Sequence, residues 1–220
     1  INENDMNSSL IGVESDGADA MNQSIQNNKI IRIEKLNTFA DGAAVHEVGR
    51  KTFPLCKQLE DIITIKNNEL CHEMVNLYQN EGIIVEPAGA LSVAALKHIS
   101  DKIEKKKVVC IISGGNNDIM RYNEIIEKSL IYQNVKHYFI IDIVQKPGQL
   151  KEFVLNVMPE NCDITRFEYI KKSNKSFGSV LIGFELSHPN SLELLILGLQ
   201  KSRFTFKRID ESDILYSYLI

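Results

Sequence analysis

The stretch that decides the fold is Val108-Val-Cys-Ile-Ile-Ser-Gly-Gly-Asn-Asn-Asp-Ile119. Its five leading apolar residues are mostly β-branched, which is typical of a strand buried on both faces of a parallel sheet. The paired glycines that follow allow a sharp turn or the close approach of a ligand. Because ligands of open α/β sheets lie at the C-terminal ends of the strands, Ser113 is predicted to lie beside a small molecule. The alternative is a tight strand–helix turn without a ligand.

The segments around this stretch alternate between strands and helices. Strands are predicted at residues 10–14, 59–65, 82–86 and 107–112, and helices at residues 18–27, 67–80 and 88–98. Asn116, Asn117 or Asp118 can cap a further helix that runs to about Leu130. This order predicts a layered α/β domain with a parallel sheet.

The sequence changes in character near Gln133. Alternating or apolar runs predict strands at residues 136–144, 163–171, 177–186 and 204–209, with helices after the turn at 146–150 and at 191–201. The order β-α-β-β-α-β is the ferredoxin-like arrangement, a small α+β domain with an antiparallel sheet. Two domains are therefore expected, residues 1–132 and residues 133–220.

Composition excludes several classes of protein. The 220 residues are 44% hydrophobic and 25% charged, with a net charge of −4, as in an ordinary globular protein. No basic cluster favours nucleic acid, and the run Lys105–Lys107 is most simply a solvated turn. No apolar stretch reaches the roughly 20 residues of a membrane helix. Four separated cysteines and no visible secretory signal predict a cytoplasmic protein with reduced thiols.

Four motifs, in order, resemble the threonine dehydratase (threonine ammonia-lyase) family. They are Ile11-Gly-Val-Glu14, Thr38-Phe-Ala-Asp-Gly-Ala-Ala-Val45, Glu86-Pro-Ala-Gly-Ala90 and Ser113-Gly-Gly-Asn116. Each motif alone is weak, but their order is specific, and Lys146-Pro-Gly-Gln-Leu150 is similar to the turn of an ACT domain. The resemblance implies a pyridoxal-phosphate enzyme of fold type II, the tryptophan synthase beta-like fold, with an ACT-like regulatory domain.

The resemblance also implies an activity and partners. The family converts L-threonine to 2-oxobutanoate and ammonia, the first step of isoleucine biosynthesis, and the cofactor is the electron sink. Isoleucine or valine is the implied effector, and a homo-oligomer, dimer or tetramer, is expected. The family's Schiff-base lysine, in a Ser-Phe-Lys-x-Arg-Gly context, and its glycine-rich phosphate loop have no counterpart here. The chain therefore resembles roughly the C-terminal half of the enzyme and is predicted to be inactive alone.

The resemblance implies a set of site residues. Ser113, Gly114, Glu86 and Gly42 are expected at the cofactor, with the Ser113 hydroxyl as partner of the pyridine nitrogen. Pro147, Gly148 and Leu150 are expected at an effector site, where helix N–H groups can receive a carboxylate. Glu14 is similar to a cation-site carboxylate of the related serine racemases, but their Asp six residues later is Ala20 here, so no metal is expected.

Plainer readings of the same residues stay open. Glu86 could satisfy the backbone donors of a helix start, and Gly89 could serve only close packing. Residues 40–42 and 146–150 could be simple turns. At the level of function, the alternatives are a non-catalytic, amino-acid-sensing regulatory fragment and a related serine/threonine dehydratase, although the latter usually lacks the C-terminal domain.

Overall fold

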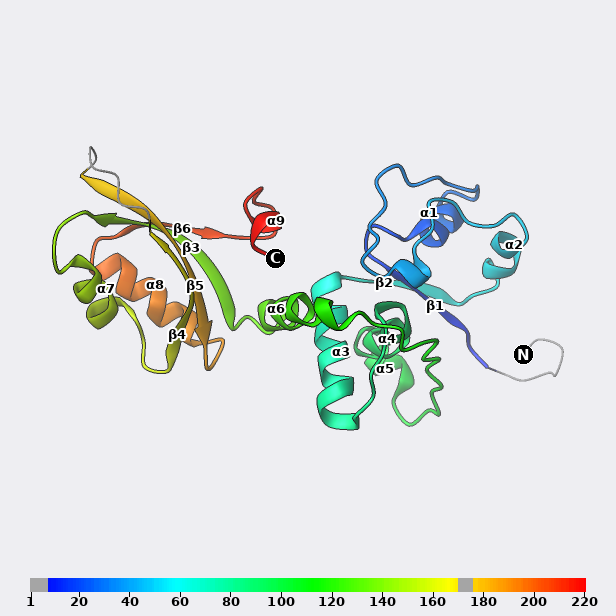
Figure 1. Cartoon of the computed structure of the whole chain (residues 1–220). Coiled ribbons are helices and arrows are strands. Elements are labelled where there is room, and N and C mark those ends of the chain that lie inside the picture. Colours follow the sequence, from blue (N-terminus) through cyan, green and yellow to red (C-terminus); the bar gives the residue numbers. More distant parts are fainter. Residues whose placement is uncertain (1–7, 170–175) are drawn as a thin grey trace. The chain divides into compact units, whose positions relative to one another are not determined.

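The computed structural model describes residues 8–169 and 176–220. It divides into two compact units, residues 1–129 and residues 130–220 (Figure 1). No helix within the described residues is long and apolar enough to cross a membrane.

The first unit contains a parallel pair of strands surrounded by helices. Its elements are β1 (Ile11–Ser15), α1 (Ala20–Gln26), η2 (Asp41–Ala43), α2 (Thr52–Cys56), β2 (Asp61–Ile65), α3 (Asn67–Glu81), α4 (Pro87–Ala94), η3 (Ala95–Ile99), α5 (Ser100–Ile103), η4 (Ile119–Arg121) and α6 (Tyr122–Tyr132), the last of which continues into the second unit. β1 and β2 pair in parallel from Ile11↔Asp61 to Ser15↔Ile65. The predicted parallel sheet is therefore present, with these two strands.

The core of the first unit forms between α3, α4 and the strands. α3 buries Leu70, Met74 and Leu77 on one face, at the helical spacing expected from the sequence. It ends at Gly82, whose φ of 68° is left-handed, as is common where a helix stops. Pro87 opens α4, where its missing N–H costs no hydrogen bond.

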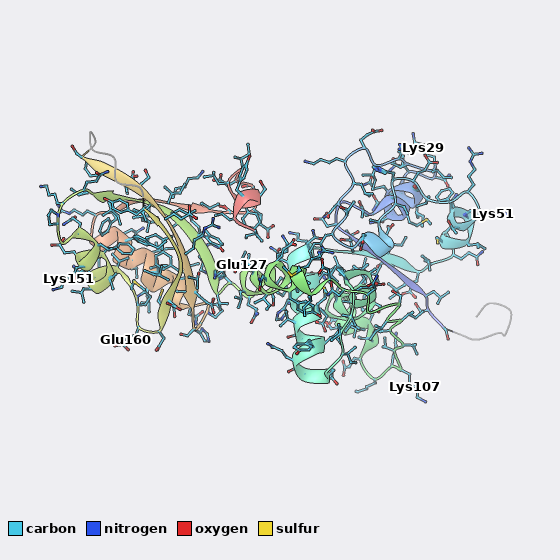
Figure 2. The ribbon with its side chains drawn as sticks, viewed as in Figure 1. Lys29, Lys51, Lys107, Glu127, Lys151 and Glu160 are labelled. Carbon is cyan, nitrogen blue, oxygen red and sulfur yellow. The ribbon has the colours of Figure 1, made fainter. Side chains whose placement is uncertain are left out.

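The prediction of strands at residues 82–86 and 107–112 is wrong. Neither segment is a strand, and Val109 and Ile111 are 87% and 75% exposed. A strand needs a neighbouring strand to accept and donate its backbone hydrogen bonds. Among the described residues the parallel sheet consists of β1 and β2 alone, so neither segment has such a neighbour. The solvated turn predicted at Lys105–Lys107 is confirmed, since all three lysines are exposed, and Figure 2 shows Lys107 at the outside of this unit.

The second unit has the predicted β-α-β-β-α-β order. Its elements are β3 (Lys136–Val144), α7 (Gln149–Val157), β4 (Cys162–Tyr169), β5 (Phe177–Leu186), α8 (Ser191–Lys201), β6 (Thr205–Ile209) and a last short helix, α9 (Tyr216–Leu219). The strands form an antiparallel sheet in the order β4-β5-β3-β6.

Both long helices of the second unit cover one face of this sheet. Phe153 of α7 and Leu195 of α8 are fully buried against Phe139, Ile182 and Phe184 of the strands. The ring of Phe139 meets that of Phe184 edge-on, with the centroids 5.8 Å apart. The second unit therefore has a hydrophobic core of its own.

Candidate functional site

Three of the predicted cofactor residues meet in the first unit, although they come from distant parts of the sequence. A Cβ atom at Gly114 would lie 2.5 Å from Oε1 of Glu86. A Cβ atom at Gly42 would lie 3.6 Å from the same oxygen and 3.2 Å from Cβ of Ala88. The carboxylate of Glu86 is thus flanked by two backbone positions that carry no side chain, one in η2 and one in the Ser113–Asn116 turn.

Glu86 stands at the N-cap of α4 but does not cap it with its side chain. Its backbone N–H donates to the carbonyl oxygen of Gly114 at 3.1 Å, while the carboxylate makes no capping hydrogen bond. Within residues 8–169 and 176–220 no group donates a hydrogen bond to this carboxylate. The alternative that Glu86 satisfies the backbone donors of the helix start is therefore wrong, and its oxygens are available to a ligand.

Gly89 serves the close approach of α4 and the glycine turn. A Cβ atom there would lie 2.6 Å from the carbonyl oxygen of Gly114, which belongs to the backbone and cannot rotate away. A Cβ atom at Gly115 would likewise lie 2.9 Å from the carbonyl oxygen of Ile84. The packing reading of Gly89 is confirmed, and the glycine turn is held tightly against the start of α4.

Asn117 anchors the far end of this turn. Its Nδ2 donates to the carbonyl oxygen of Val85 at 3.2 Å, and its backbone N–H donates to Gly115 at 3.0 Å. Its Oδ1 is buried and has no hydrogen-bond partner in the described part of the chain. Ser113, at the near end, is exposed, and its hydroxyl forms no hydrogen bond with any described residue. The turn therefore presents a free hydroxyl on a fixed backbone.

Two residues that sequence reasoning did not single out fix the loop that carries Gly42. Asn37 donates through Nδ2 to the carbonyl oxygen of Asp16 at 2.8 Å and accepts the N–H of Phe39 at 3.0 Å. Arg121 donates to the carbonyl oxygen of Phe39 at 3.3 Å and stacks over its ring, 4.8 Å from the centroid. These contacts join residues up to 82 positions apart, so no local sequence signal could have revealed them.

Asp118 confirms one capping prediction. Its side chain accepts the N–H of Met120 at 2.9 Å, at the start of the η4 turn that leads into α6. The other end of the stretch is tied to α4, because Ser92 donates through Oγ to the carbonyl oxygen of Ile111 at 2.8 Å.

Glu14 is occupied by its own chain. Its two carboxylate oxygens accept the N–H groups of Met21 and Asn22, at 3.0 and 2.7 Å, at the start of α1. Burial raises the pKa of this carboxyl, the two backbone hydrogen bonds lower it, and the neighbouring Asp19 raises it further. Among the described residues, no group of three or more His, Cys, Asp or Glu side chains could hold a metal ion.

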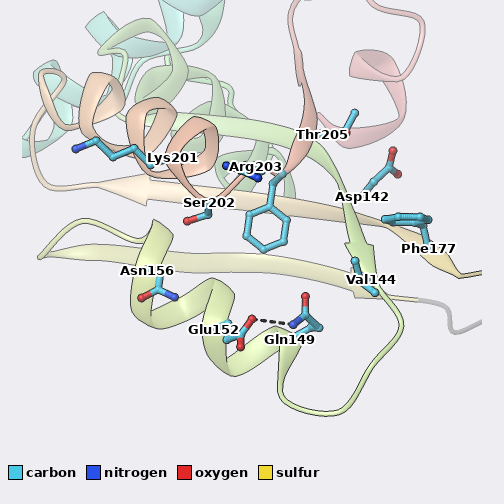
Figure 3. A pocket seen from close by; sticks show the side chains of 11 residues that line it. Asp142, Val144, Gln149, Glu152, Asn156, Phe177, Lys201, Ser202, Arg203 and Thr205 are labelled. Carbon is cyan, nitrogen blue, oxygen red and sulfur yellow. Dashed lines mark hydrogen bonds between the residues drawn. The ribbon is translucent and has the colours of Figure 1, made fainter.

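In the second unit the turn before α7 places the three predicted effector residues at the surface. Pro147, Gly148 and Leu150 are exposed, and Gly148 adopts a left-handed φ of 88°. A cavity of about 390 Å³ lies next to this turn (Figure 3). None of the three residues lines it, whereas Gln149, the first residue of α7, does.

Comparisons with known proteins show which family the chain resembles. A family described as "Pyridoxal-phosphate dependent enzyme" matches residues 1–114, and the "C-terminal regulatory domain of Threonine dehydratase" matches residues 127–219. The biosynthetic L-threonine dehydratase IlvA of Halalkalibacterium halodurans is 47% identical over 212 residues, covering 96% of this chain and 51% of the relative. The Staphylococcus aureus (strain NCTC 8325) enzyme of the same name is 43% identical over 213 residues, covering 96% of this chain and 50% of the relative.

A solved structure supports the fold. The processed form of threonine deaminase isoform 2 from Solanum lycopersicum superposes with a TM-score of 0.53 at 28% identity, covering 56% of this chain and 35% of that chain. The chain therefore belongs to the family of pyridoxal-phosphate dependent enzymes. Its resemblance to threonine dehydratases extends through both units, and it spans about half the length of the curated relatives it matches.

The residues of the first unit fit the cofactor of this family, pyridoxal phosphate. The free hydroxyl of Ser113 offers a neutral donor, and the missing side chains at Gly42 and Gly114 leave room for the Glu86 carboxylate, which has no hydrogen-bond partner among the described residues. The buried Oδ1 of Asn117 is a further acceptor without a partner among the described residues. These polar groups without partners among the described residues are suited to bind the polar atoms of the cofactor.

Proposed function

We propose that this chain is the C-terminal half of a threonine dehydratase, which converts L-threonine to 2-oxobutanoate and ammonia. In this proposal residues 1–132 are the C-terminal portion of the catalytic domain, and residues 133–220 form the ACT-like regulatory domain. The observation that carries the proposal is the meeting of Gly42, Glu86 and Gly114 at the turn that begins with Ser113, whose hydroxyl has no partner among the described residues.

Each proposed cofactor residue has a distinct task. The Ser113 hydroxyl would donate a hydrogen bond to the pyridine nitrogen of the cofactor, and as a neutral group it would leave that nitrogen unprotonated. Glu86 would supply a carboxylate to the bound cofactor, and Gly42 and Gly114 leave room for that carboxylate. When bound, pyridoxal phosphate supplies the electron sink for the charge that develops at the substrate Cα. The lysine that binds the cofactor covalently and the phosphate loop lie outside these 220 residues.

The regulatory proposal concerns the second unit. Isoleucine or valine is proposed as effector near the Pro147–Leu150 turn, and the protein is proposed to be a cytoplasmic homo-oligomer, a dimer or a tetramer. Support comes from the match of residues 127–219 to a regulatory domain. Light scattering of the complete enzyme, with and without added isoleucine, measures the oligomeric state. A monomer under both conditions would contradict the proposed homo-oligomer.

Complementation tests the catalytic proposal. The chain alone, and the chain co-expressed with the N-terminal half of the Halalkalibacterium halodurans relative, are incubated with pyridoxal phosphate and L-threonine, and 2-oxobutanoate is measured. We expect no product from the chain alone and turnover from the complemented protein. Turnover by the chain alone would contradict the proposal that the cofactor-binding lysine lies outside these residues. No turnover from a folded complemented protein would favour the second candidate, a non-catalytic amino-acid-sensing fragment, which the lack of a Ser-Phe-Lys-x-Arg-Gly motif supports.

Variants of the complemented protein test the role of Ser113. Ser113→Asp replaces a neutral donor by a charged group that stabilises a protonated ring nitrogen, so the ratio of elimination to transamination products is expected to fall. Ser100→Asp is the matched control, because Ser100 is an exposed serine at the start of α5. An unchanged product ratio in Ser113→Asp would contradict the assigned role.

A further inference from the structure

The turn of residues 113–117 has few backbone contacts of its own. No backbone N–H of residues 107–116 donates a hydrogen bond within the described part of the chain. Gly114 and Gly115 also lack the side chains that restrict a backbone, so this turn has more conformational freedom than an ordinary one. Contacts with the neighbouring segment, residues 84–86, therefore decide how firmly the turn is held.

Two hydrogen bonds join the turn to this segment. The backbone N–H of Glu86 donates to the carbonyl oxygen of Gly114 at 3.1 Å. Nδ2 of Asn117 donates to the carbonyl oxygen of Val85 at 3.2 Å, and among the described residues it is the one side chain that links the two segments by a hydrogen bond. Because Val85 is buried, little water competes for this second hydrogen bond.

The amide of Asn117 is committed to this link. Its backbone N–H donates to the carbonyl oxygen of Gly115 at 3.0 Å, so the residue is tied to both segments. Its Oδ1 is buried and has no hydrogen-bond partner among the described residues. A buried acceptor without a partner is unfavourable, and an apolar side chain of similar size would avoid it. The Nδ2 donor is therefore the group that distinguishes Asn117 from an apolar residue in the same space.

The link to Val85 determines where the hydroxyl of Ser113 lies. This hydroxyl forms no hydrogen bond with any described residue, so its position follows from the backbone of the turn. Two glycines separate Ser113 from the asparagines that end the turn, and they allow the backbone to move if its far end is released. Loss of the Asn117 donor would therefore displace the Ser113 hydroxyl relative to Glu86.

We propose that Asn117 is a positioning residue, which fixes the Ser113 hydroxyl for the pyridine nitrogen of pyridoxal phosphate. Asn117 acts through the carbonyl oxygen of Val85 and the backbone of the turn. This inference rests on the proposed function, in which Ser113 is the partner of the ring nitrogen, and adds the side chain on which that geometry depends.

Hydrogen exchange in the 220-residue chain without cofactor tests the link itself. Asn117→Ala removes the donor, and Asn117→Asp keeps the shape of the side chain but places an acceptor against the Val85 carbonyl oxygen. In both variants the Glu86 amide should exchange roughly tenfold faster, because its acceptor at Gly114 is no longer held. The Leu77 amide within α3 should be unchanged, which verifies that the first unit is folded. An unchanged rate of the Glu86 amide in both variants would overturn the inference.

A double-mutant cycle in the complemented protein tests whether Asn117 acts through Ser113. The dissociation constant of pyridoxal phosphate is measured by titrating the cofactor-free protein and following the absorbance of the cofactor. Ser113→Ala and Asn117→Ala are each expected to weaken binding roughly fivefold, about the effect of one hydrogen bond. The double variant should also bind roughly fivefold more weakly, because the link matters only while the hydroxyl is present. Asn80→Ala, at an exposed asparagine near the end of α3, is the matched control and should change binding less than about twofold.

The outcomes separate this inference from the proposed function. Binding that is roughly twenty-fivefold weaker in the double variant would show that the two residues act independently, and would overturn the inference. A loss in Ser113→Ala with unchanged binding in Asn117→Ala would also overturn it, but would leave the proposed role of Ser113 standing. Unchanged binding in Ser113→Ala would overturn the role of Ser113 in the proposed function, and this inference with it.

Discussion

At the scale of single residues, His137 is a buried group whose pKa is strongly lowered. It is 3% exposed, and its Nε2 donates to the carbonyl oxygen of Asn134 at 3.0 Å, so this nitrogen carries the proton in the neutral ring. Burial, and then the charge of Arg208, lower the pKa of His137 from its ordinary 6.5 to about 4, against a smaller opposing effect of the hydrogen bond to Asn134. The folded second unit therefore keeps this ring uncharged at pH 5, where the unfolded chain is protonated.

This difference predicts a pH dependence of stability. Between pH 6.5 and pH 4 the unfolded state binds more protons than the folded state, so the free energy of unfolding rises with pH in this window. The contribution of His137 to stability is fully present above pH 6.5 and is lost as the pH falls towards 4. Between pH 7 and pH 5 the second unit should lose about 2 kcal/mol. Urea unfolding at both pH values measures this loss.

His137→Gln keeps a donor for Asn134 but cannot titrate, so its stability should vary much less between the two pH values. His188→Gln, at an exposed histidine, is the matched control and should keep the full dependence. An equal loss in His137→Gln and in the unchanged chain would contradict the assignment to His137.

The two carboxylates of the first unit show what sequence can and cannot predict about a site. Glu14 and Glu86 both lie where a strand or extended segment meets a helix, and both belong to motifs of the family. Glu14 accepts two backbone N–H groups of α1, whereas Glu86 accepts none from α4. The ordered motifs could propose site residues, but the hydrogen bonds of each carboxylate depend on backbone orientation, which sequence patterns do not contain.

At the scale of elements, the segment of residues 107–113 has the composition of a buried strand without the pairing of one. No backbone N–H of these residues donates a hydrogen bond within the described part of the chain. The side chains of Val109 and Ile111 are exposed, as is that of Ile84 in the neighbouring segment. The apolar composition of this segment thus indicates that it is suited to the buried interior of a sheet. Strand pairing also requires a neighbouring strand, which the described residues do not supply.

Hydrogen exchange of backbone amides tests this interpretation. In the chain alone, the amides of residues 108–112 should exchange rapidly, and those of residues 139–141, which lie between β5 and β6, should be protected. In the protein complemented with the N-terminal half, the amides of residues 108–112 should become protected by an order of magnitude or more, because a new strand neighbour pairs with them. Rapid exchange in the active complemented protein would show that this segment is not a strand of the sheet.

The elements that were predicted well are those with their partners inside the chain. α3 follows from the spacing of Leu70, Met74 and Leu77, which is the spacing of one helical face. The six elements from β3 to β6 follow from alternation and turn residues, because each strand finds its neighbour within 90 residues of sequence. The strand predicted at residues 107–112 failed for the opposite reason.

At the scale of the whole chain, the two units have separate hydrophobic cores. Leu70 and Ile125 belong to the core of the first unit, and Phe153 and Leu195 to that of the second. All four are fully buried. None of the described residues belongs to both cores, so each unit is expected to unfold as a cooperative block of its own.

Calorimetry of paired core variants tests this independence. Leu70→Ala and Phe153→Ala each remove buried apolar volume, which destabilises a unit by about 2–5 kcal/mol and lowers its transition by roughly 10 °C or more. Leu70→Ala should shift the transition of the first unit only, and Phe153→Ala that of the second only. The transition of the first unit is expected at the lower temperature, because its apolar segments near residues 84 and 109 are exposed. A single transition that both variants shift equally would contradict two independent units.

The separation of the two cores also affects how such a protein can change over generations. The cavity beside α7 belongs to the second unit, whereas Glu86 and Gly114 pack within the first unit. Substitutions in one hydrophobic core can therefore accumulate without repacking the other core. A gene segment that encodes the second unit can likewise be joined to a gene for another enzyme, because the second unit has its own hydrophobic core.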